Sequence, residues 1–329
     1  MILSSILEFF LALTGLGQPT PPVLPARVVE PASAAEVHME LYTGMEESLG
    51  ISFNHSLPVV NAAMTFGPQR IPSDSLGILT SAQSAVVVDE RTWSVLFDKQ
   101  SNVQTPIASI SKLMTALVLL DAGLDPVQRV TISKSDYISG GIIHFFSGEE
   151  VLMQDLWMTG LIASDNVAIA AMVRSTGLGT EEFVARMNLK ARALGMENTS
   201  FVEPTGISEF NVSTATDVAR LVSEAMKHRE ISDAVRRPVY TFEPLNKAVV
   251  RRAYTTNELL GSFVNKEPYT IRGGKTGFTN EAGYCLSVVV DGPTDADDVI
   301  VVLLGAPTNN DRFLEVKGLV DWVYANYEW

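Results

Sequence analysis

The sequence predicts an α+β fold, in which one antiparallel sheet is flanked by helices and incorporates a helical lobe. Two observations favour this fold. Strand-like runs lie toward both ends of the 329-residue chain, and helical periodicity fills the stretch between them. With 46% hydrophobic and 19% charged residues, the chain can bury a large core. A cleft is expected where the sheet and the lobe meet.

The first strands are expected where regular structure begins. Residues 84–89 and 92–97 are strand-like and are separated only by Glu90 and Arg91, which indicates a hairpin with a tight turn. Near the carboxyl end, an acidic loop at residues 291–298 would make the strands on either side of it antiparallel. The strands expected in this part of the chain are residues 269–275, 284–290 and 299–304.

Helices are expected between these two groups of strands. Ile110, Leu113 and Leu117 recur at helical spacing after Pro106, and Gly123 is suited to end the helix. This first helix is apolar on most sides, so we expect it to be buried. Further helices fit residues 152–162, 167–173, 181–194 and 214–226, and a final amphipathic helix fits residues 313–327.

The chain divides into three predicted segments. Residues 1–35 combine an apolar stretch with several prolines, which is typical of an export signal or membrane anchor followed by a stiff linker. Residues 36–80 show no sustained period and are expected to form an irregular extension. Residues 81–329 would form the main domain, with the helical lobe at about residues 110–235. An export signal implies an extracytoplasmic protein, periplasmic or at the cell surface, either secreted or tethered by its amino terminus.

Charge and composition exclude several classes of site. The formal net charge of −14 disfavours nucleic-acid binding, because phosphates would be repelled. Cys285 is the only cysteine, so no internal disulfide can form, and its position in an apolar run indicates a core residue. The four histidines are scattered without metal-ligand spacing, so we expect neither a metal nor another cofactor.

Three short motifs in a fixed order indicate a catalytic serine that is served by lysines. The first motif contains Ser109 and Lys112, which lie three residues apart at the start of a helix, so their side chains share one face and can touch. Burial of Lys112, together with a second cation such as Lys275, would lower the lysine pKa enough for the amine to take the hydroxyl proton. The alternative is a helix-capping serine beside a surface lysine. Lys112 lies among apolar neighbours, where a solvated lysine is unexpected.

The second motif, Ser164-Asp165-Asn166, is expected at a junction between two helices. Ser164 could relay a proton, and Asn166 could hold a substrate amide. Helix capping is the alternative, and it is the simpler interpretation of this motif taken alone, because these residue types are favoured at helix N-termini.

The third motif, residues 275–277, ends a predicted strand and follows Gly273 and Gly274. These glycines let the backbone approach another segment closely. On an edge strand, the motif could pair with an extended peptide, offer Lys275 as a cation and donate a backbone amide. The alternative is an exposed lysine in a glycine-rich turn.

At these motifs, the chain resembles the serine D-alanyl-D-alanine peptidases, the low-molecular-mass penicillin-binding proteins that trim peptidoglycan. The resemblance runs from about Ser81 to Trp322 and includes the segments 193–196, 201–206 and 211–215. It implies a β-lactamase/transpeptidase-like fold. It also implies cofactor-free hydrolysis of D-Ala-D-Ala peptides of peptidoglycan through an acyl-enzyme, and binding of β-lactam inhibitors.

The resemblance also implies a role for each motif residue. Ser109 would be the nucleophile, Lys112 its base, Ser164 the proton shuttle to the leaving amine, and Asn166 the residue that orients the acyl donor. Lys275 would stabilise charge, Thr276 would meet the terminal carboxylate, Gly277 would contact the substrate, and the backbone amides of Ser109 and Phe278 would form the oxyanion hole.

The choice of scissile bond stays open. Phe278 follows the third motif, where many carboxypeptidases of this family have histidine. In this respect the chain resembles the members that act as endopeptidases on peptide cross-links. Carboxypeptidase and endopeptidase activity are therefore both expected possibilities.

Two other functions remain as alternatives. A class A β-lactamase shares the three motifs but needs a Glu-x-x-Leu-Asn element to activate water, and here Glu203 is followed by Thr205-Gly206-Ile207-Ser208. A catalytically silent cell-wall-binding protein is the second alternative. The intact Ser109, Lys112 and Lys275 argue against it, because a binding module needs no serine held beside a base.

Overall fold

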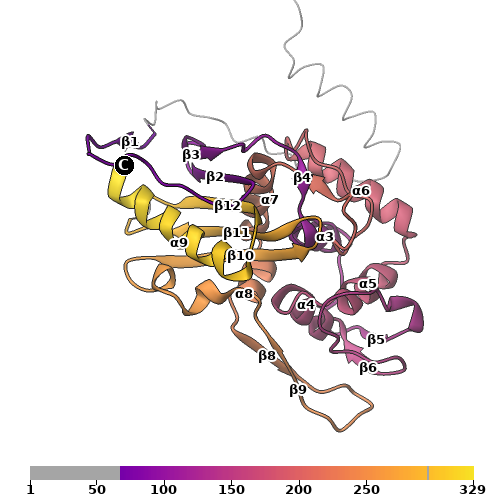
Figure 1. Ribbon diagram of the computed structural model, residues 1–329. Coiled ribbons are helices and arrows are strands. Elements are labelled where there is room, and N and C mark those ends of the chain that lie inside the picture. The colour runs from indigo at the N-terminus through magenta and orange to yellow at the C-terminus, as the bar shows by residue number, and fades with distance from the viewer. Residues whose placement is uncertain (1–66, 295) are drawn as a thin grey trace, which may run out of the picture. The chain divides into compact units, whose positions relative to one another are not determined.

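The computed structural model describes residues 67–294 and 296–329 (Figure 1). At the centre is a five-stranded antiparallel sheet with the strand order β10-β11-β12-β2-β3. Its strands are β2 (Ser84–Asp89), β3 (Val95–Lys99), β10 (Thr270–Thr279), β11 (Gly283–Asp291) and β12 (Val299–Ala306). Segments from both ends of the chain therefore form one sheet, which confirms the predicted α+β fold.

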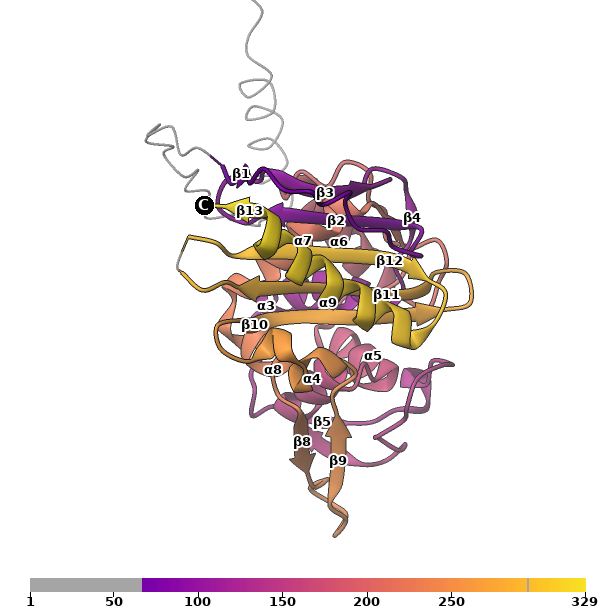
Figure 2. The same cartoon turned by 60° about the vertical axis from the view of Figure 1, so that its left-hand side comes forward.

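Both faces of this sheet are covered, because successive side chains of its central strands enter two different hydrophobic clusters. Val86 and Val302 pack with the helical lobe, whereas Val87 and Val301 pack with α9 (Asn309–Asn326). Figure 2 shows α9 lying across the strands on its face of the sheet. The three inner strands, β2, β11 and β12, are nearly continuous apolar runs because neither of their faces meets water.

Six helices lie between Ser111 and Val235 and form the helical lobe. They are α3 (Ser111–Asp121), α4 (Met153–Ile162), α5 (Asn166–Ser175), α6 (Thr180–Ala193), α7 (Ala215–Lys227) and α8 (Arg229–Val235). The periodicity predicted all of them except α8, which is only seven residues long and is separated from α7 by His228 alone. The expected burial of the first helix is confirmed, since nine of the 11 residues of α3 are buried.

Within residues 67–294 and 296–329, four pairs of short strands and four 3-10 turns complete the fold. The pairs are β1 (Gln69–Arg70) with β13 (Tyr327–Glu328), β4 (Thr105–Pro106) with β7 (Val212–Ser213), β5 (Arg129–Thr131) with β6 (Glu150–Leu152), and β8 (Val239–Phe242) with β9 (Arg251–Tyr254). The turns are η1 (Ala108–Ile110), η2 (Lys134–Asp136), η3 (Glu258–Gly261) and η4 (Phe263–Asn265). The β8–β9 hairpin projects from the end of the lobe (Figures 1 and 2), and the sequence analysis did not predict it.

Two predicted boundaries were wrong. The turn between β2 and β3 is longer than two residues, because Trp93 adopts a φ of 59° and Asp89 accepts a hydrogen bond from the backbone N–H of Thr92. The third motif does not end its strand, because β10 continues to Thr279 and pairs with β11 throughout the motif. The described part of the irregular extension contains one short strand, β1, which pairs with β13 near the carboxyl end of the chain.

The predicted export signal or anchor at residues 1–35, and the extension up to residue 66, lie outside the described residues. These segment assignments and the tether therefore stay predictions. Within the described ranges, no helix combines the length and the apolar character that crossing a bilayer requires.

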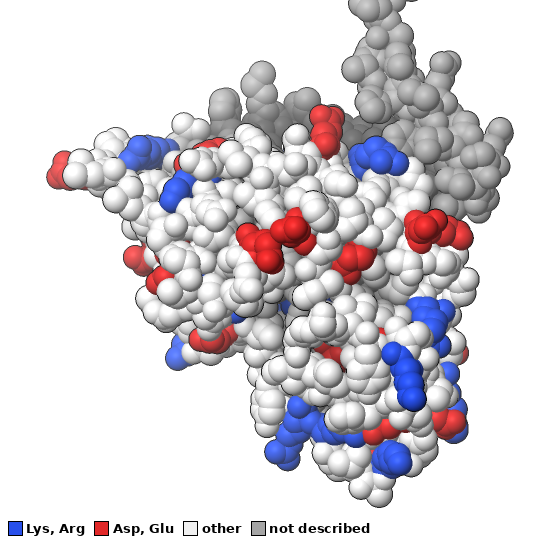
Figure 3. All heavy atoms as spheres, turned by 45° about the vertical axis from the view of Figure 1, so that its right-hand side comes forward, with Lys and Arg blue, Asp and Glu red and all other residues white. Residues whose placement is uncertain are grey.

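The charged side chains are unevenly distributed over the face of the molecule that Figure 3 shows. On the face shown in Figure 3, Lys and Arg side chains gather toward the lower end, which belongs to the helical lobe, while Asp and Glu side chains lie across its middle.

Candidate active site

Ser109 and Lys112 lie together where the helical lobe begins. Ser109 is in η1, and Lys112 is in the first turn of α3. The Nζ of Lys112 lies 2.8 Å from the Oγ of Ser109. The same Nζ donates to Oδ1 of Asn166 at 2.7 Å and to the carbonyl oxygen of Thr205 at 2.6 Å. The structure therefore brings the serine hydroxyl and the lysine amine within hydrogen-bonding distance.

The environment of Lys112 favours the neutral amine. Its side chain is fully buried, and burial lowers its pKa from 10.5 to about 7, against the opposing effects of Glu203 and Asp165. The sequence analysis also expected Lys275 to lower this pKa. In the structure, Lys275 is not among the groups that shift the pKa of Lys112; burial lowers the pKa of Lys275 itself, and repulsion from Lys112 and Arg312 lowers it further. Lys112 can thus act as a base near neutral pH.

Two glycines let neighbouring segments press against the backbone around Ser109. A Cβ at Gly206 would lie 2.1 Å from the carbonyl oxygen of Ala108, and one at Gly277 would lie 2.8 Å from that of Ile107. Gly206 also has a φ of 80°, which other residues adopt only with strain. These close contacts place β10 and the loop around Gly206 on either side of the serine.

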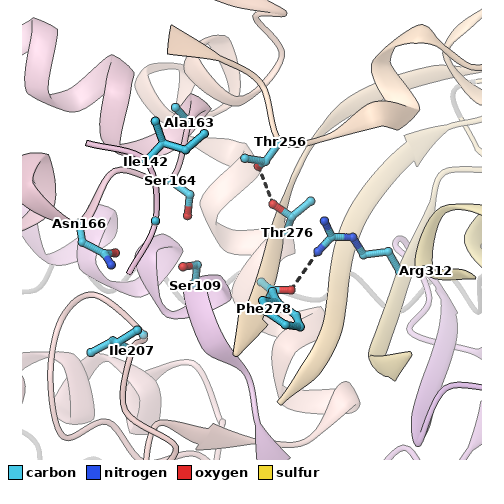
Figure 4. Close-up of a pocket in the computed structure, with 13 residues that line it drawn as sticks. Ser109, Ile142, Ala163, Ser164, Asn166, Ile207, Thr256, Thr276, Phe278 and Arg312 are labelled. Carbon is cyan, nitrogen blue, oxygen red and sulfur yellow. Dashed lines mark hydrogen bonds between the residues drawn. The ribbon is translucent and has the colours of Figure 1, made fainter. Parts of the chain in front are cut away.

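The junction between α4 and α5 carries the second motif, as predicted. Ser164 has a φ of 62°, and Asp165 caps α5 by accepting a hydrogen bond from the N–H of Ala168 at 3.1 Å. Asn166 accepts from Lys112 and donates to the carbonyl oxygen of Gly140 at 3.1 Å. Capping and a place in the site are therefore not alternatives, because Asp165 caps the helix while its two neighbours turn toward Ser109 (Figure 4).

Lys275 connects the third motif to the second. Its Nζ donates to the Oγ of Ser164 at 3.0 Å and to the carbonyl oxygen of Thr276 at 3.1 Å. The side chain is almost fully buried, so the alternative of an exposed lysine in a turn is wrong. Strand β10 is at the edge of the sheet, as the peptide-pairing interpretation required.

A cleft opens above these residues (Figure 4). Three apolar side chains line it, and all are at least 38% exposed: Ile142, Ile207 and Phe278. Phe278 stacks on Tyr284 with a centroid distance of 4.2 Å. The remaining lining residues are Ser109, Gly141, Ala163, Ser164, Asn166, Gly206, Thr256, Thr276, Gly277 and Arg312. All the predicted site residues therefore line this cleft or, as Lys112 and Lys275 do, contact residues that line it.

The family profile described as "D-alanyl-D-alanine carboxypeptidase" matches residues 73–308, which include all three motifs and the cleft except Arg312. The chain belongs to the D-alanyl-D-alanine carboxypeptidase family. This assignment confirms the resemblance on which the sequence analysis relied.

Similar proteins of this family are named either endopeptidases or carboxypeptidases. The chain is 36% identical over 251 residues to the D-alanyl-D-alanine endopeptidase of Pseudomonas aeruginosa, covering 73% of this chain and 76% of the relative. It is 34% identical to the D-alanyl-D-alanine endopeptidase of Escherichia coli, and the match covers 79% of this chain and 84% of the relative. It is 32% identical to the D-alanyl-D-alanine carboxypeptidase DacF of Bacillus subtilis, and the match covers 80% of this chain and 69% of the relative.

Among solved structures, the Streptomyces K15 DD-transpeptidase is similar to this chain. The two share a TM-score of 0.69 and 26% sequence identity over 76% of this chain and 100% of the K15 enzyme. This similarity confirms the predicted penicillin-binding type of fold.

The position of Glu203 bears on the β-lactamase alternative within this fold. The Glu203 carboxylate accepts hydrogen bonds from the backbone N–H groups of Thr205 and Gly206, both at 2.6 Å, and from that of Ser208 at 3.3 Å. Asn211 Nδ2 also donates to it at 3.1 Å. A carboxylate that is occupied by its own loop is poorly placed to activate a water molecule.

The sequence analysis missed several residues of the site. Thr256 contacts Thr276 through their hydroxyl oxygens at 2.5 Å, and the guanidinium of Arg312 donates to the carbonyl oxygen of Gly277 at 2.9 Å. His144 bonds to Asp165, although the histidines appeared isolated in the sequence. None of the three belongs to a short motif, and each meets its partner only through the tertiary fold.

The single cysteine is no competing nucleophile. Cys285 is fully buried in β11, and burial raises the pKa of its thiol to about 11. No group of three or more His, Cys, Asp and Glu side chains in the described ranges could hold a metal ion.

Proposed function

We propose that this chain hydrolyses D-alanyl-D-alanine-type bonds in peptidoglycan stem peptides through an acyl-enzyme on Ser109. The observation that carries the proposal is the 2.8 Å contact between the Ser109 hydroxyl and the buried Lys112 amine. A general base must lie within hydrogen-bonding distance of the proton that it removes and must be unprotonated at the working pH. Lys112 meets both conditions, because burial lowers its pKa to about 7.

In the first step, Lys112 takes the hydroxyl proton as Ser109 attacks the carbonyl carbon of the penultimate D-alanine. The backbone N–H groups of Ser109 and Phe278 donate to the oxygen that becomes negative. The Ser164 hydroxyl, which bonds to Lys275, delivers its proton to the leaving amine and regains one from the Lys112 ammonium, so that the proton taken from Ser109 ends on the amine. Asn166 and Thr276 hold the acyl donor and the carboxylate of the departing residue. Water then releases the acyl group and restores Ser109.

Labelled penicillin tests this proposal, because a β-lactam acylates the same serine. After digestion, mass spectrometry should find the adduct on the peptide that contains Ser109. The variant Ser109→Ala should carry no adduct, whereas Ser147→Ala, which removes an exposed serine of the same lobe, should be labelled like the wild type. Labelling elsewhere, or none in the wild type, would refute the proposed acyl-enzyme.

We further propose that the preferred bond lies in a peptide cross-link, which makes the enzyme an endopeptidase. Phe278 and Ile142 leave an apolar, exposed rim that can accommodate a large leaving group. Three relatives with more than 30% identity are named endopeptidases. Incubation with a pentapeptide and, separately, with a cross-linked dimer should show faster cleavage of the dimer. Faster release of alanine from the pentapeptide would assign carboxypeptidase activity instead.

We propose an extracytoplasmic location for this activity, because peptidoglycan lies outside the cytoplasmic membrane. The apolar stretch at residues 1–17 supports export or an amino-terminal tether. Fractionation of cells should recover the protein outside the cytoplasm. Recovery in the cytoplasmic fraction would contradict this location without bearing on the chemistry at Ser109.

A further inference from the structure

A histidine and a buried aspartate meet behind the catalytic cleft. The Nδ1 of His144 lies 2.9 Å from Oδ2 of Asp165, and the backbone N–H of His144 donates to the same oxygen at 2.8 Å. Asp165 is fully buried, and the His144 side chain is only 10% exposed. Because an ionised carboxylate can only accept hydrogen bonds, Nδ1 of His144 carries the proton in this contact.

The segment that carries His144 is itself held in place from the β8–β9 hairpin. Arg251, in β9, donates to the carbonyl oxygen of His144 at 2.7 Å and forms an ion pair with Glu149 at 2.5 Å. Its guanidinium also lies 4.8 Å from the ring centroid of Phe146. The imidazole is therefore fixed between the hairpin and the junction of α4 and α5.

Asp165 is positioned to pass this restraint to the catalytic residues. It stands between Ser164 and Asn166, and three donors hold its carboxylate: the backbone and ring N–H groups of His144, and the N–H of Ala168. Ser164 occupies the left-handed region with a φ of 62°, which costs conformational energy unless its neighbours hold it there. A shift of Asp165 would move Ser164 and Asn166 together.

We infer that His144 is a positioning residue for the reaction, whose ring N–H holds Asp165 and offsets part of its negative charge beside the catalytic lysine. This inference rests on the proposed acyl-enzyme function. His144 would touch neither the substrate nor Ser109, and it would act only through its contact with Asp165.

The charges around the pair determine the expected sign of its effect. Asp165 and Glu203 favour the protonated form of Lys112, while Lys275 is the other titratable group that faces this lysine. Arg251, which donates to the carbonyl oxygen of His144, is neutralised by its ion pair with Glu149. Loss of the imidazole N–H would leave the Asp165 charge less compensated. The pKa of Lys112 would then rise, and less neutral amine would be present at a given pH.

The test is the pH profile of acylation by labelled penicillin in the full chain. For His144→Ala, the midpoint of the acidic limb should shift to higher pH by about half a pH unit to one pH unit, with less change on the alkaline side. His144→Asn should restore the wild-type midpoint, because its side-chain N–H can occupy the place of Nδ1. His144→Gln, whose amide reaches farther, should not restore it. His228→Ala, which removes a half-exposed histidine beside Glu224, is the matched control and should leave the profile unchanged.

Each result decides the inference. An equal loss of rate at every pH, with an unchanged midpoint, would show a purely structural role and would overturn it. A downward shift of the midpoint would also overturn it, as would rescue by glutamine and not by asparagine. Labelling of wild-type Ser109 in the same experiment shows separately whether the proposed acyl-enzyme function holds.

Discussion

Lys112 is a fully buried lysine with three hydrogen-bond acceptors: the hydroxyl of Ser109, the side-chain oxygen of Asn166 and the carbonyl of Thr205. A structural lysine would be expected to pair with a carboxylate when it is buried so deeply. Here none of the three acceptors carries a charge, so the amine can lose its proton without leaving an unpaired anion. This set of partners distinguishes a base from a structural ammonium.

At the residue scale, we expect Lys112→Met to lower the rate of Ser109 acylation by roughly 10²- to 10⁴-fold, because the general base is lost while the serine stays in place. The rate constant for labelled-penicillin binding measures this effect. Lys190→Met, which removes a lysine that pairs with Asp121 at the lobe surface, serves as the control and should react at the wild-type rate. Rapid acylation of Lys112→Met would mean that another group removes the proton.

The same substitution should change how stability depends on pH. The pKa of Lys112 is about 7 in the folded chain and near 10.5 when unfolded, so between these values the unfolded chain binds a proton that the folded chain does not. The free energy of unfolding of the wild type should therefore rise with pH across this window. Below about pH 7, where the buried lysine is protonated in the folded chain, it destabilises the fold most. Lys112→Met should lack the part of this rise that Lys112 contributes, whereas the buried Lys275, whose pKa is also lowered, should contribute in both proteins.

Urea unfolding at several pH values measures the difference between the two proteins. We expect the free energy of unfolding of the variant to exceed that of the wild type most at the lowest pH values and least at the highest. Parallel stability curves would show that burial does not lower the pKa of this lysine.

At the scale of elements, the site depends on segments that touch backbone to backbone. The loop at Gly206 and strand β10 at Gly277 both lie against η1 where a Cβ would collide. The position of the nucleophile is thus set by the packing of three elements more than by any single side-chain contact.

We expect Gly206→Ala to destabilise the fold by about 2 kcal/mol or more, because it combines a positive φ with a collision against backbone. Acylation of Ser109 should fall as well, since η1 must shift. Gly179→Ala is the matched control: this glycine has a φ of −67° and open space at its Cβ position. Thermal unfolding and penicillin labelling of both variants give the comparison, and similar behaviour of the two would refute the role of close packing.

The sequence predicted those parts of the site that depend on local spacing. Ser109 and Lys112 are three residues apart on one helix, so their contact follows from helix geometry. Thr256, Arg312 and His144 could not be found in this way, because their partners lie 20, 35 and 21 residues away along the chain. Such contacts exist only once the sheet and the lobe have packed together.

The same limit explains the errors in the elements. The central strands and long helices were predicted because apolar spacing over many residues specifies them. The β8–β9 hairpin has no such signal, since β9 contains the consecutive residues Arg251 and Arg252, and Arg251 is held by an ion pair with Glu149 instead of by an apolar face. The turn before β3 was misplaced because the Asp89 side chain, and not a glycine, stabilises it.

At the scale of the whole molecule, the central strands contribute alternate side chains to both hydrophobic clusters. Val86 and Val87 are neighbours in β2, but they pack against the lobe and against α9 respectively. Neither cluster can lose its packing without disturbing the strands that complete the other. The sheet and the lobe should therefore unfold as one cooperative unit.

Tryptophan fluorescence can test this cooperativity, because the reporters are divided between the clusters. Trp157 packs against the lobe cluster, whereas Trp322 and Trp329 pack against the cluster around α9. We expect the fluorescence transition of Trp157→Phe to coincide with the transition of the wild type and with that seen by far-ultraviolet circular dichroism. Separate midpoints would show that the lobe and the sheet unfold independently.

The occupied carboxylate of Glu203 has a practical consequence. Because the Glu203 carboxylate is held by its own loop and is not free to activate water, the covalent complex with a β-lactam should persist, so that each competent molecule consumes one equivalent of drug and then stops. A fluorescent β-lactam would then serve as a stoichiometric titrant that counts working copies of the protein in a preparation.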